Sequence, residues 1–281
     1  MSDAEARAVT GERPGRRPLL TFFALVYLTT WVCFIAARSA GALKWPLLIF
    51  GSFTPSVVAV ILTARQEGRA AVRALLRRLL QWRVGARWYV FALAYMAAIK
   101  LVVALIYRAT TGAWPAFGSY PAWYVVLVTW LAAMFLGGPL GEEIGWRGYA
   151  LPRLQQRFGM AAGSIVLGVL WALWHWPVFF IPGLDQYGQA FVPYILYVTA
   201  LSVAFTWLYN NTAGSLLLAV LMHTAVNQTK DIVTSRVPEP GNPLALRATS
   251  LAWITIALMW LTATYFISAS RRMALSSART L

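Results

Sequence analysis

The 281-residue sequence is poor in cysteine, in acidic side chains and in charge of any kind. Its single cysteine, Cys33, excludes an intrachain disulfide and a cysteine cluster that binds zinc. Because Cys33 lies inside an apolar run, we interpret it as a small buried apolar residue. Charged residues make up only 12% of the chain, about half of what a water-soluble domain carries. This shortage argues against a soluble domain.

What the chain does contain is apolar and basic. Hydrophobic residues make up 59% of it, the mean hydropathy is +0.62, and 24 Lys and Arg outnumber 9 Asp and Glu, for a net charge of +15. Such an excess raises the question of nucleic acid. The arginines, however, lie between long apolar runs, where they hold loops on the cytoplasmic side and favour anionic lipid headgroups. We therefore predict an integral membrane protein whose partner is the lipid bilayer, with no nucleic acid bound.

The apolar runs are long enough to cross a bilayer as helices of about 20 residues. They cover residues 19–37, 45–64, 88–107, 122–140, 161–181, 191–209, 213–233 and 248–268. The first run is longer than the apolar part of a signal peptide, which indicates a retained anchor. The pattern predicts an all-α fold, a polytopic helical membrane bundle of about eight transmembrane helices.

The domain organisation follows from the same runs. We expect a flexible basic N-terminal tail over residues 1–18, one polytopic membrane domain over residues 19–270, and a cytoplasmic tail over residues 271–281. No internal repeat or long polar linker divides the chain.

The distribution of arginine predicts the orientation in the cell membrane. Residues 65–87 hold seven arginines, and further basic residues lie in 147–157 and at the C-terminus, whereas the loops near Arg108 and Asp185 carry few charges. The positive-inside rule then places both termini in the cytoplasm, with an even number of spans. Leu and Arg recur at helical spacing over residues 70–82, which predicts a basic amphipathic helix on the inner leaflet or an extra solvated helix.

Ionisable side chains within the apolar runs are scarce, and each costs about 2.5 to 3.5 kcal/mol at the bilayer centre. Glu142 and Glu143 are the two acidic residues that adjoin the end of a span, and both histidines, His175 and His223, lie within spans. Lys100, near the middle of the third span, is a further outlier. We favour snorkelling of Lys100 toward the membrane surface over a place in a cavity wall.

The spacing of these residues is regular. Glu143 and Arg147 are four apart, so on a helix they share a face and can form an ion pair, while Glu142 points about 100 degrees away. Two further pairs, Trp171 with His175 and His223 with Asn227, have the same spacing. We expect each pair to project toward a shared interior.

These residue types suit hydrolysis of a peptide bond. A carboxylate in a poorly hydrated cavity can act as general base for a water, while imidazole and carboxamide groups stabilise an oxyanion. A serine elbow and a His-Glu-x-x-His motif are both missing from the sequence. A purely structural ion pair remains an equal reading of Glu143 and Arg147, and hydrogen-bonded packing is the alternative for His175.

The three motifs resemble those of a known family. Glu142-Glu143-x-x-x-Arg147, then Trp171-x-x-x-His175, then His223-x-x-x-Asn227 look like the motifs of CPBP intramembrane proteases, which are related to type II CAAX prenyl endopeptidase and to bacteriocin-processing or immunity proteins. The similarity covers roughly residues 122–233, with a weaker echo at residues 51–55. Trp171 replaces the commoner phenylalanine and keeps its aromatic character.

The resemblance implies an eight-helix fold with a conical cavity open to the membrane and the cytosol. It also implies that the residue matching Glu142 activates water, that His175, His223 and Asn227 surround the scissile carbonyl, and that Glu143 and Arg147 support them. The expected spans put Glu142 near the inner surface and both histidines ten to fifteen residues deep. We therefore expect the fourth helix to end deeper in the membrane than the run 122–140 suggests.

The leading hypothesis is an intramembrane endopeptidase that cleaves membrane-anchored peptides or proteins near the cytoplasmic face. A catalytically idle immunity or regulatory protein is the main alternative. A transporter is less favoured, because two similar halves are missing. Two cofactor states stay open: a zinc ion on Glu142, His175 and His223 with an open position, or no metal. The sequence does not disclose the substrate, and prenyl-CAAX cleavage follows from the resemblance alone.

Overall fold

The computed structural model describes residues 16–118, 123–230, 232–237 and 239–279. Within these ranges the chain is helical, apart from loops and one isolated bridge between Phe117 and Val233. Six helical stretches are long and apolar enough to cross a membrane. The predicted polytopic helical membrane fold is confirmed.

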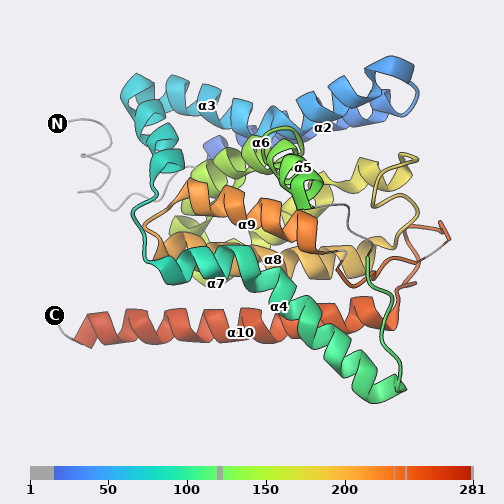
Figure 1. Cartoon of the computed structure of the whole chain (residues 1–281). Coiled ribbons are helices and arrows are strands. Elements are labelled where there is room, and N and C mark those ends of the chain that lie inside the picture. The colour runs from blue at the N-terminus through green and yellow to red at the C-terminus, as the bar shows by residue number, and fades with distance from the viewer. Residues whose placement is uncertain (1–15, 119–122, 231, 238, 280–281) are drawn as a thin grey trace.

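Helices joined by short connections, such as α2 with α3 and α7 with α8, lie antiparallel to each other. In Figure 1, α2 and α3 lie together along the top of the view and α10 lies below them, with most of the other helices in between, while α4 crosses α10 and extends past it at the lower right. Helix α7 packs on α8, α4 on α9, and α10 on α8. The long helices are α2 (Arg16–Ala37), α3 (Lys44–Arg77), α4 (Ala86–Thr111), α5 (Trp123–Leu136), α7 (Leu151–Trp174), α8 (Phe191–Asn211), α9 (Leu216–Thr229) and α10 (Ser250–Arg279).

The predicted tails are only partly described. Helix α2 already begins at Arg16, and residues 1–15 of the predicted N-terminal tail lie outside the described residues. Helix α10 runs on to Arg279, so the described part of the predicted C-terminal tail is helical. Cys33 is 8% exposed, as the interpretation of a small buried residue requires.

The fourth and fifth predicted spans join in one helical stretch. A short helix, α6 (Pro139–Glu143), and a π-helical turn, Ile144–Ala150, connect α5 to α7, so the stretch Val128–Phe180 is nearly continuous. The seventh predicted span holds the shorter apolar helix α9. Glu142 therefore lies within a helical stretch, and the hydrogen bond from Trp171 brings its carboxylate to the part of α7 that precedes His175.

Glycine allows the sharpest bends of this stretch and of α3. Gly138 has φ of 104° immediately before Pro139, a backbone conformation that other residues rarely adopt. Gly68, with φ of 83°, bends α3 in the same way. After Gly68 a basic helical segment follows, with Leu75 buried and Arg73 exposed, in the region where the sequence predicts a basic amphipathic helix.

Two glycines let α6 and the π-helical turn approach α3 closely. A Cβ atom on Gly141 would lie 2.7 Å from the carbonyl oxygen of Ser52, and one on Gly145 would lie 2.6 Å from the carbonyl of Pro55. Small residues four apart on one helix face permit such backbone contact in membranes. Residues 51–55, the weaker part of the family similarity in the sequence, thus pack against the segment that carries both glutamates. Ser56 Oγ also donates to the Leu140 carbonyl at 3.0 Å.

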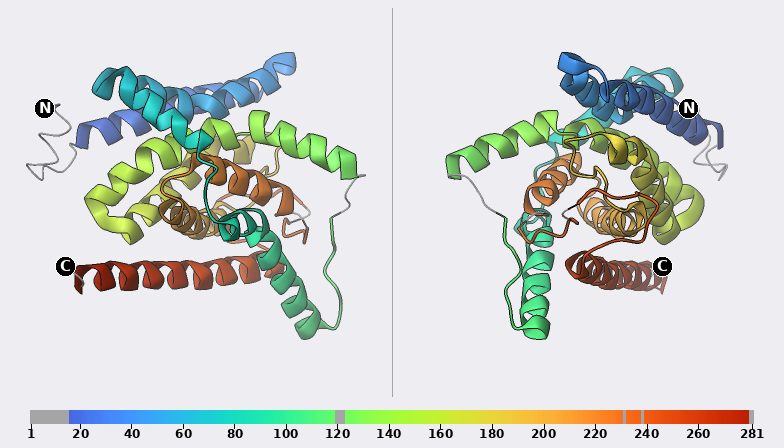
Figure 2. Two further views of the ribbon diagram at one scale, coloured as in Figure 1. Left: turned by 60° about the vertical axis from the view of Figure 1, so that its left-hand side comes forward. Right: turned by 90° about the vertical axis from the view of Figure 1, so that its right-hand side faces the viewer.

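Contacts between loops define two ends of the bundle. At the first, which we call the arginine-rich end, Arg153 pairs with Glu67, and Ser215 Oγ donates to the Gln81 carbonyl at 2.8 Å. These contacts join the end of α3, the start of α7 and the α8–α9 turn. The start of α2 and the end of α10 lie on the same side of the molecule in Figures 1 and 2.

At the second end, which we call the opposite end, the remaining loops meet. Lys44 Nζ donates to the Pro182 carbonyl at 2.7 Å, and the Phe191 amide donates to the Pro243 carbonyl at 2.8 Å. Asp185 joins this end to the segment after α9 through Lys230. Successive connections of the chain thus lie alternately at one end of the bundle and at the other.

Candidate active site

The predicted site residues converge on one cavity. Glu142, His175, His223 and Asn227 line a cavity of about 360 Å³, and they come from α6, the end of α7 and α9. The pairs Trp171/His175 and His223/Asn227 thus share one interior, as their spacing predicts. Glu143 and Arg147 do not line this cavity, since both are fully buried behind it.

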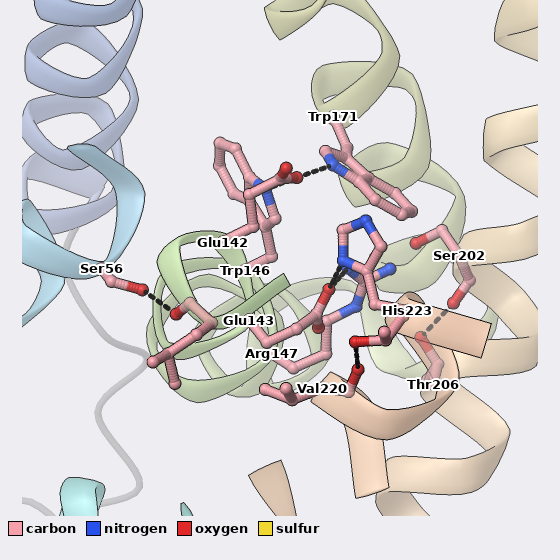
Figure 3. A network of polar contacts seen from close by, with 12 residues as sticks. Ser56, Glu142, Glu143, Trp146, Arg147, Trp171, Ser202, Thr206, Val220 and His223 are labelled. Carbon is pink, nitrogen blue, oxygen red and sulfur yellow. Dashed lines mark hydrogen bonds and ion pairs between the residues drawn. The ribbon is translucent and has the colours of Figure 1, made fainter. Parts of the chain in front are cut away.

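Two indole groups hold the Glu142 carboxylate. Trp171 Nε1 donates to Glu142 Oε2 at 2.6 Å, and Trp146 Nε1 donates to the same oxygen at 3.2 Å (Figure 3). Glu142 Oε1 takes part in neither bond, and a Cβ atom on Gly138 would lie 2.6 Å from it. One carboxylate oxygen is therefore fixed, while glycine at position 138 leaves space beside the other.

Glu143 is the centre of a buried charge cluster. Its Oε1 accepts hydrogen bonds from Arg147 Nη1 at 2.9 Å and from His223 Nδ1 at 2.7 Å (Figure 3). The predicted ion pair across one helical turn is confirmed. Because a carboxylate only accepts, Nδ1 of His223 carries the proton of this bond and Nε2 is left for other contacts. Glu143 thereby orients the ring of His223.

Aromatic rings enclose the charge of Arg147. The guanidinium carbon lies 4.2 Å from the ring centre of Trp171 and 4.1 Å from that of Phe205. A cation between two ring faces gains electrostatic attraction where water is excluded. Trp171 therefore contacts both charged groups of the site, Glu142 through its N–H and Arg147 through its face.

His175 and Asn227 complete the cavity wall. His175 follows the last residue of α7, and its Nδ1 donates to the Trp171 carbonyl at 2.9 Å, which leaves Nε2 as the second ring nitrogen. Its ring packs edge-on against Trp174 and Tyr194, with centroids 4.6 and 5.7 Å away. Asn227 lies one helical turn after His223 on α9.

Comparison with known proteins agrees with this arrangement. Residues 122–229 match the family model described as type II CAAX prenyl endopeptidase Rce1-like. The chain is also 25% identical over 204 residues to CAAX prenyl protease 2 of Methanococcus maripaludis, an alignment that covers 66% of this chain and 72% of that protein. These matches support a CPBP-family protease. The matched range contains all three motifs of the resemblance. Of the described residues that line the cavity, Lys230 alone lies outside this range, by one residue.

A zinc ion on Glu142, His175 and His223 would be another way to activate water. Among the described residues no three His, Cys, Asp or Glu side chains are grouped so that they could hold a metal ion. As placed, these three side chains do not form a zinc site.

The mouth of this cavity carries charge. Asp185 and Lys230 both line the cavity, and Asp185 accepts from Lys230 Nζ at 2.6 Å and from Arg236 Nη1 at 2.8 Å. Burial alone would raise the pKa of Asp185, but the two cations outweigh burial and hold that pKa below its usual value. Asp185 is therefore ionised at neutral pH and ties the α7–α8 loop to the segment after α9.

Sequence reasoning missed several neighbours of the CPBP motifs. Trp146 is four residues after Glu142, so helical spacing could have indicated its contact with that carboxylate. Phe205, Tyr194 and Tyr197 come from α8, a helix without ionisable residues, and no signal in the sequence marks them.

The snorkelling interpretation of Lys100 is wrong. Its side chain is 3% exposed and its Nζ donates to Ser235 Oγ at 2.7 Å. Lys100 lines a second cavity of about 170 Å³, next to the first, and Tyr194 and Tyr197 line both. The segment after α9 covers Lys100 and supplies oxygen acceptors, so the ammonium group has no need to reach the membrane surface.

Proposed function

We propose that the protein is an intramembrane endopeptidase of the CAAX prenyl protease 2 type, which hydrolyses a peptide bond in a membrane-anchored substrate with a water activated by Glu142. The observation that carries the proposal is the placement of Glu142, His175, His223 and Asn227 around one cavity. These residues lie within the range that matches the Rce1-like family model.

The chemistry follows from the hydrogen bonds of Glu142. Since Trp146 and Trp171 hold Oε2, Oε1 is the atom that accepts a proton from water. As that proton leaves, the water oxygen bonds to the scissile carbonyl carbon and the carbonyl oxygen becomes an oxyanion. Glu142 then delivers the same proton to the amide nitrogen, the C–N bond breaks, and the resulting carboxylic acid passes its proton to the amine, so that a carboxylate and an ammonium group are released.

The oxyanion requires donors at the cavity wall. Asn227 offers a carboxamide N–H, and each imidazole offers Nε2–H in its protonated form. Glu143 and Arg147 act through His223, whose Nδ1 they fix, and so they are positioning residues. A site that is fixed by buried partners needs little reorganisation during the reaction.

The anchored substrate follows from the membrane setting of the cavity. Helix α5 contributes Ala133 to the cavity wall and carries the exposed apolar residues Leu131 and Phe135, and Gly137, just after α5, also lines the cavity. Figure 2 shows α5 at the outside of the bundle. A substrate with a lipid anchor or a transmembrane segment can thus reach the cavity along α5, and both termini of the enzyme are expected in the cytoplasm of the cell.

Hydrolysis of defined peptides tests the proposal. Purified protein in detergent would receive one peptide sequence in three forms: farnesylated within a CAAX ending, anchored by an acyl chain, and without an anchor. We expect cleavage of an anchored form, faster than that of the unanchored peptide and unchanged by a chelator. A well-folded protein that cleaves neither anchored peptide would refute the proposal. Activity that chelation abolishes and zinc restores would instead indicate a metalloprotease.

A further inference from the structure

The charge distribution and the position of the cavity mouth together indicate the side of the membrane from which substrates enter. We infer that the cavity opens on the extracytoplasmic side, so that its substrates are membrane-anchored chains whose scissile bond is presented at the outer leaflet. That these chains are substrates rests on the proposed function, whereas the side on which the cavity opens does not depend on that function.

The exposed part of the cavity wall belongs to the opposite end of the bundle. Among the lining residues, Asp185 and Lys230 have side chains that are 50% and 26% exposed. Both belong to connections at this end, the loop after α7 and the segment after α9. From Glu142 the cavity passes Asn227, one turn before Lys230, and reaches water beside Asp185.

The cavity is closed toward the arginine-rich end. Behind Glu143 and Arg147 lie Tyr149 and Leu216, each with no exposed surface. Beyond them, the hydroxyl of Tyr149 donates to Gln66 at 3.0 Å, at the end of α3. A side chain on Gly148 would meet Leu216 and Leu75, so this layer is packed without a channel for a peptide.

The arginine-rich end has the charge of a cytoplasmic surface. Residues 65–87 contain seven arginines and one acidic residue, Glu67, and Arg153 and Arg157 add to them at the start of α7. The opposite end has fewer cations in its loops, and Asp185 and Glu239 offset part of their charge. Because Lys and Arg near span ends are retained in the cytoplasm, the arginine-rich end faces inward.

The orientation of the cavity follows directly. A cavity that opens at the end remote from the arginine clusters faces away from the cytoplasm. This differs from the cytosolic opening that the family resemblance implies and from cleavage near the cytoplasmic face. Suitable substrates are lipid-anchored or single-span proteins that carry a cleavable segment just outside the membrane.

Cysteine accessibility tests the inference. In a Cys33→Ala background, which has no other cysteine, the variants Gln186→Cys and Leu244→Cys place a thiol at the opposite end, and Ala74→Cys places one at the arginine-rich end. Gln186 lines the cavity mouth, while Leu244 and Ala74 are exposed. Intact cells would be treated with a membrane-impermeant maleimide before and after permeabilisation, with the cysteine-free parent as control.

We expect Gln186→Cys and Leu244→Cys to be labelled in intact cells, and Ala74→Cys to lose all labelling unless the cells are permeabilised. Labelling of Ala74→Cys alone in intact cells would overturn the inference, because the cavity would then face the cytoplasm. Equal labelling of all three would overturn it too, because the two ends would not lie on opposite sides.

A failure of the proposed function is distinguishable from this result. Hydrolysis is measured on detergent-solubilised protein, where sidedness is lost, and labelling requires no activity. An inactive protein with the expected labelling refutes the protease proposal and supports the outward cavity. An active protein with the reverse labelling supports the protease proposal and refutes the outward cavity.

Discussion

Glu142 and Glu143 are neighbours in the sequence with different surroundings. Adjacent residues on a helix point about 100 degrees apart. Glu142 therefore faces the cavity and two indole N–H groups, while Glu143 faces Arg147 and His223. This separation lets one carboxylate react with water while the other keeps a histidine in place.

Replacing one partner of the buried ion pair should destabilise the protein more than replacing both partners. Arg147→Met leaves the Glu143 charge buried with His223 alone, and we expect a loss of about 3 to 5 kcal/mol in unfolding free energy. The double variant Glu143→Gln/Arg147→Met should be more stable than Arg147→Met, because no unpaired charge remains. Thermal unfolding in detergent measures both.

The control for this pair is Arg247→Met, which removes an exposed ion pair with Glu239. Exposed pairs contribute about 0 to 1 kcal/mol, so its midpoint should stay close to that of the wild type. A double variant as unstable as Arg147→Met would contradict this interpretation of the charge cluster.

His223 and Asn227 should share the stabilisation of the oxyanion. Replacing either by Ala is expected to lower the rate of hydrolysis by about a hundredfold to a thousandfold, since each removes one donor. Thr229→Ala is the matched control on α9, because Thr229 bonds within its own helix to Ala225 and does not line the cavity. Full activity of both His223→Ala and Asn227→Ala would place the oxyanion elsewhere.

At the scale of helices, the segment between α5 and α7 determines where the site lies. Gly138 and Pro139 start a new helix, and a π-helical turn follows Glu143. Such turns occur frequently at functional sites because they re-aim side chains within a helix. Here the turn lies between Glu143 and α7 and is packed directly on α3 at Pro55.

Gly145→Ala tests this packing. Its Cβ would lie 2.6 Å from backbone atoms of Pro55, so α3 must shift. We expect a loss of about 1 to 3 kcal/mol from overpacking, together with reduced hydrolysis. Gly85→Ala is the control, since the nearest atom to its Cβ would be 4.0 Å away. Equal unfolding midpoints for the two variants would show that contact with α3 does not constrain the site.

Much of the fold and of the candidate site could be predicted from the sequence. Apolar runs predicted the helices, and spacing of four predicted the pair of Glu143 and Arg147 and the common direction of His223 and Asn227. These inferences depend on local periodicity, which the sequence contains.

The remaining features depend on contacts between distant segments. The π-helical turn, the burial of Lys100 and the contact of Phe205 with Arg147 arise from packing between helices. Glu142 lies on a new helix that begins after the bend at Gly138, where composition suggested the end of a span. Because these contacts join segments that are distant in the sequence, no local sequence pattern predicts them.

At the scale of the whole molecule, alternate connections gather at opposite ends of the bundle, and the arginines gather at one of them. This end also carries the start of α2 and the end of α10 (Figures 1 and 2). Reporter fusions to the N- and C-termini should both indicate the cytoplasm, because the basic loops are retained there. A cytoplasmic signal at one terminus and a periplasmic or extracellular signal at the other would require an odd number of spans.

The central claim is that Glu142 activates the water that cleaves the substrate. Its most direct test is kcat for hydrolysis of an anchored peptide by Glu142→Gln, which keeps the shape of the side chain and an acceptor for the indole N–H groups but removes the base. Glu67→Gln, at an exposed carboxylate of the arginine-rich end, is the matched control. We predict that kcat of Glu142→Gln falls by about a hundredfold to ten-thousandfold with an unchanged unfolding midpoint, while Glu67→Gln matches the wild type. Wild-type activity in a folded Glu142→Gln variant would contradict the account.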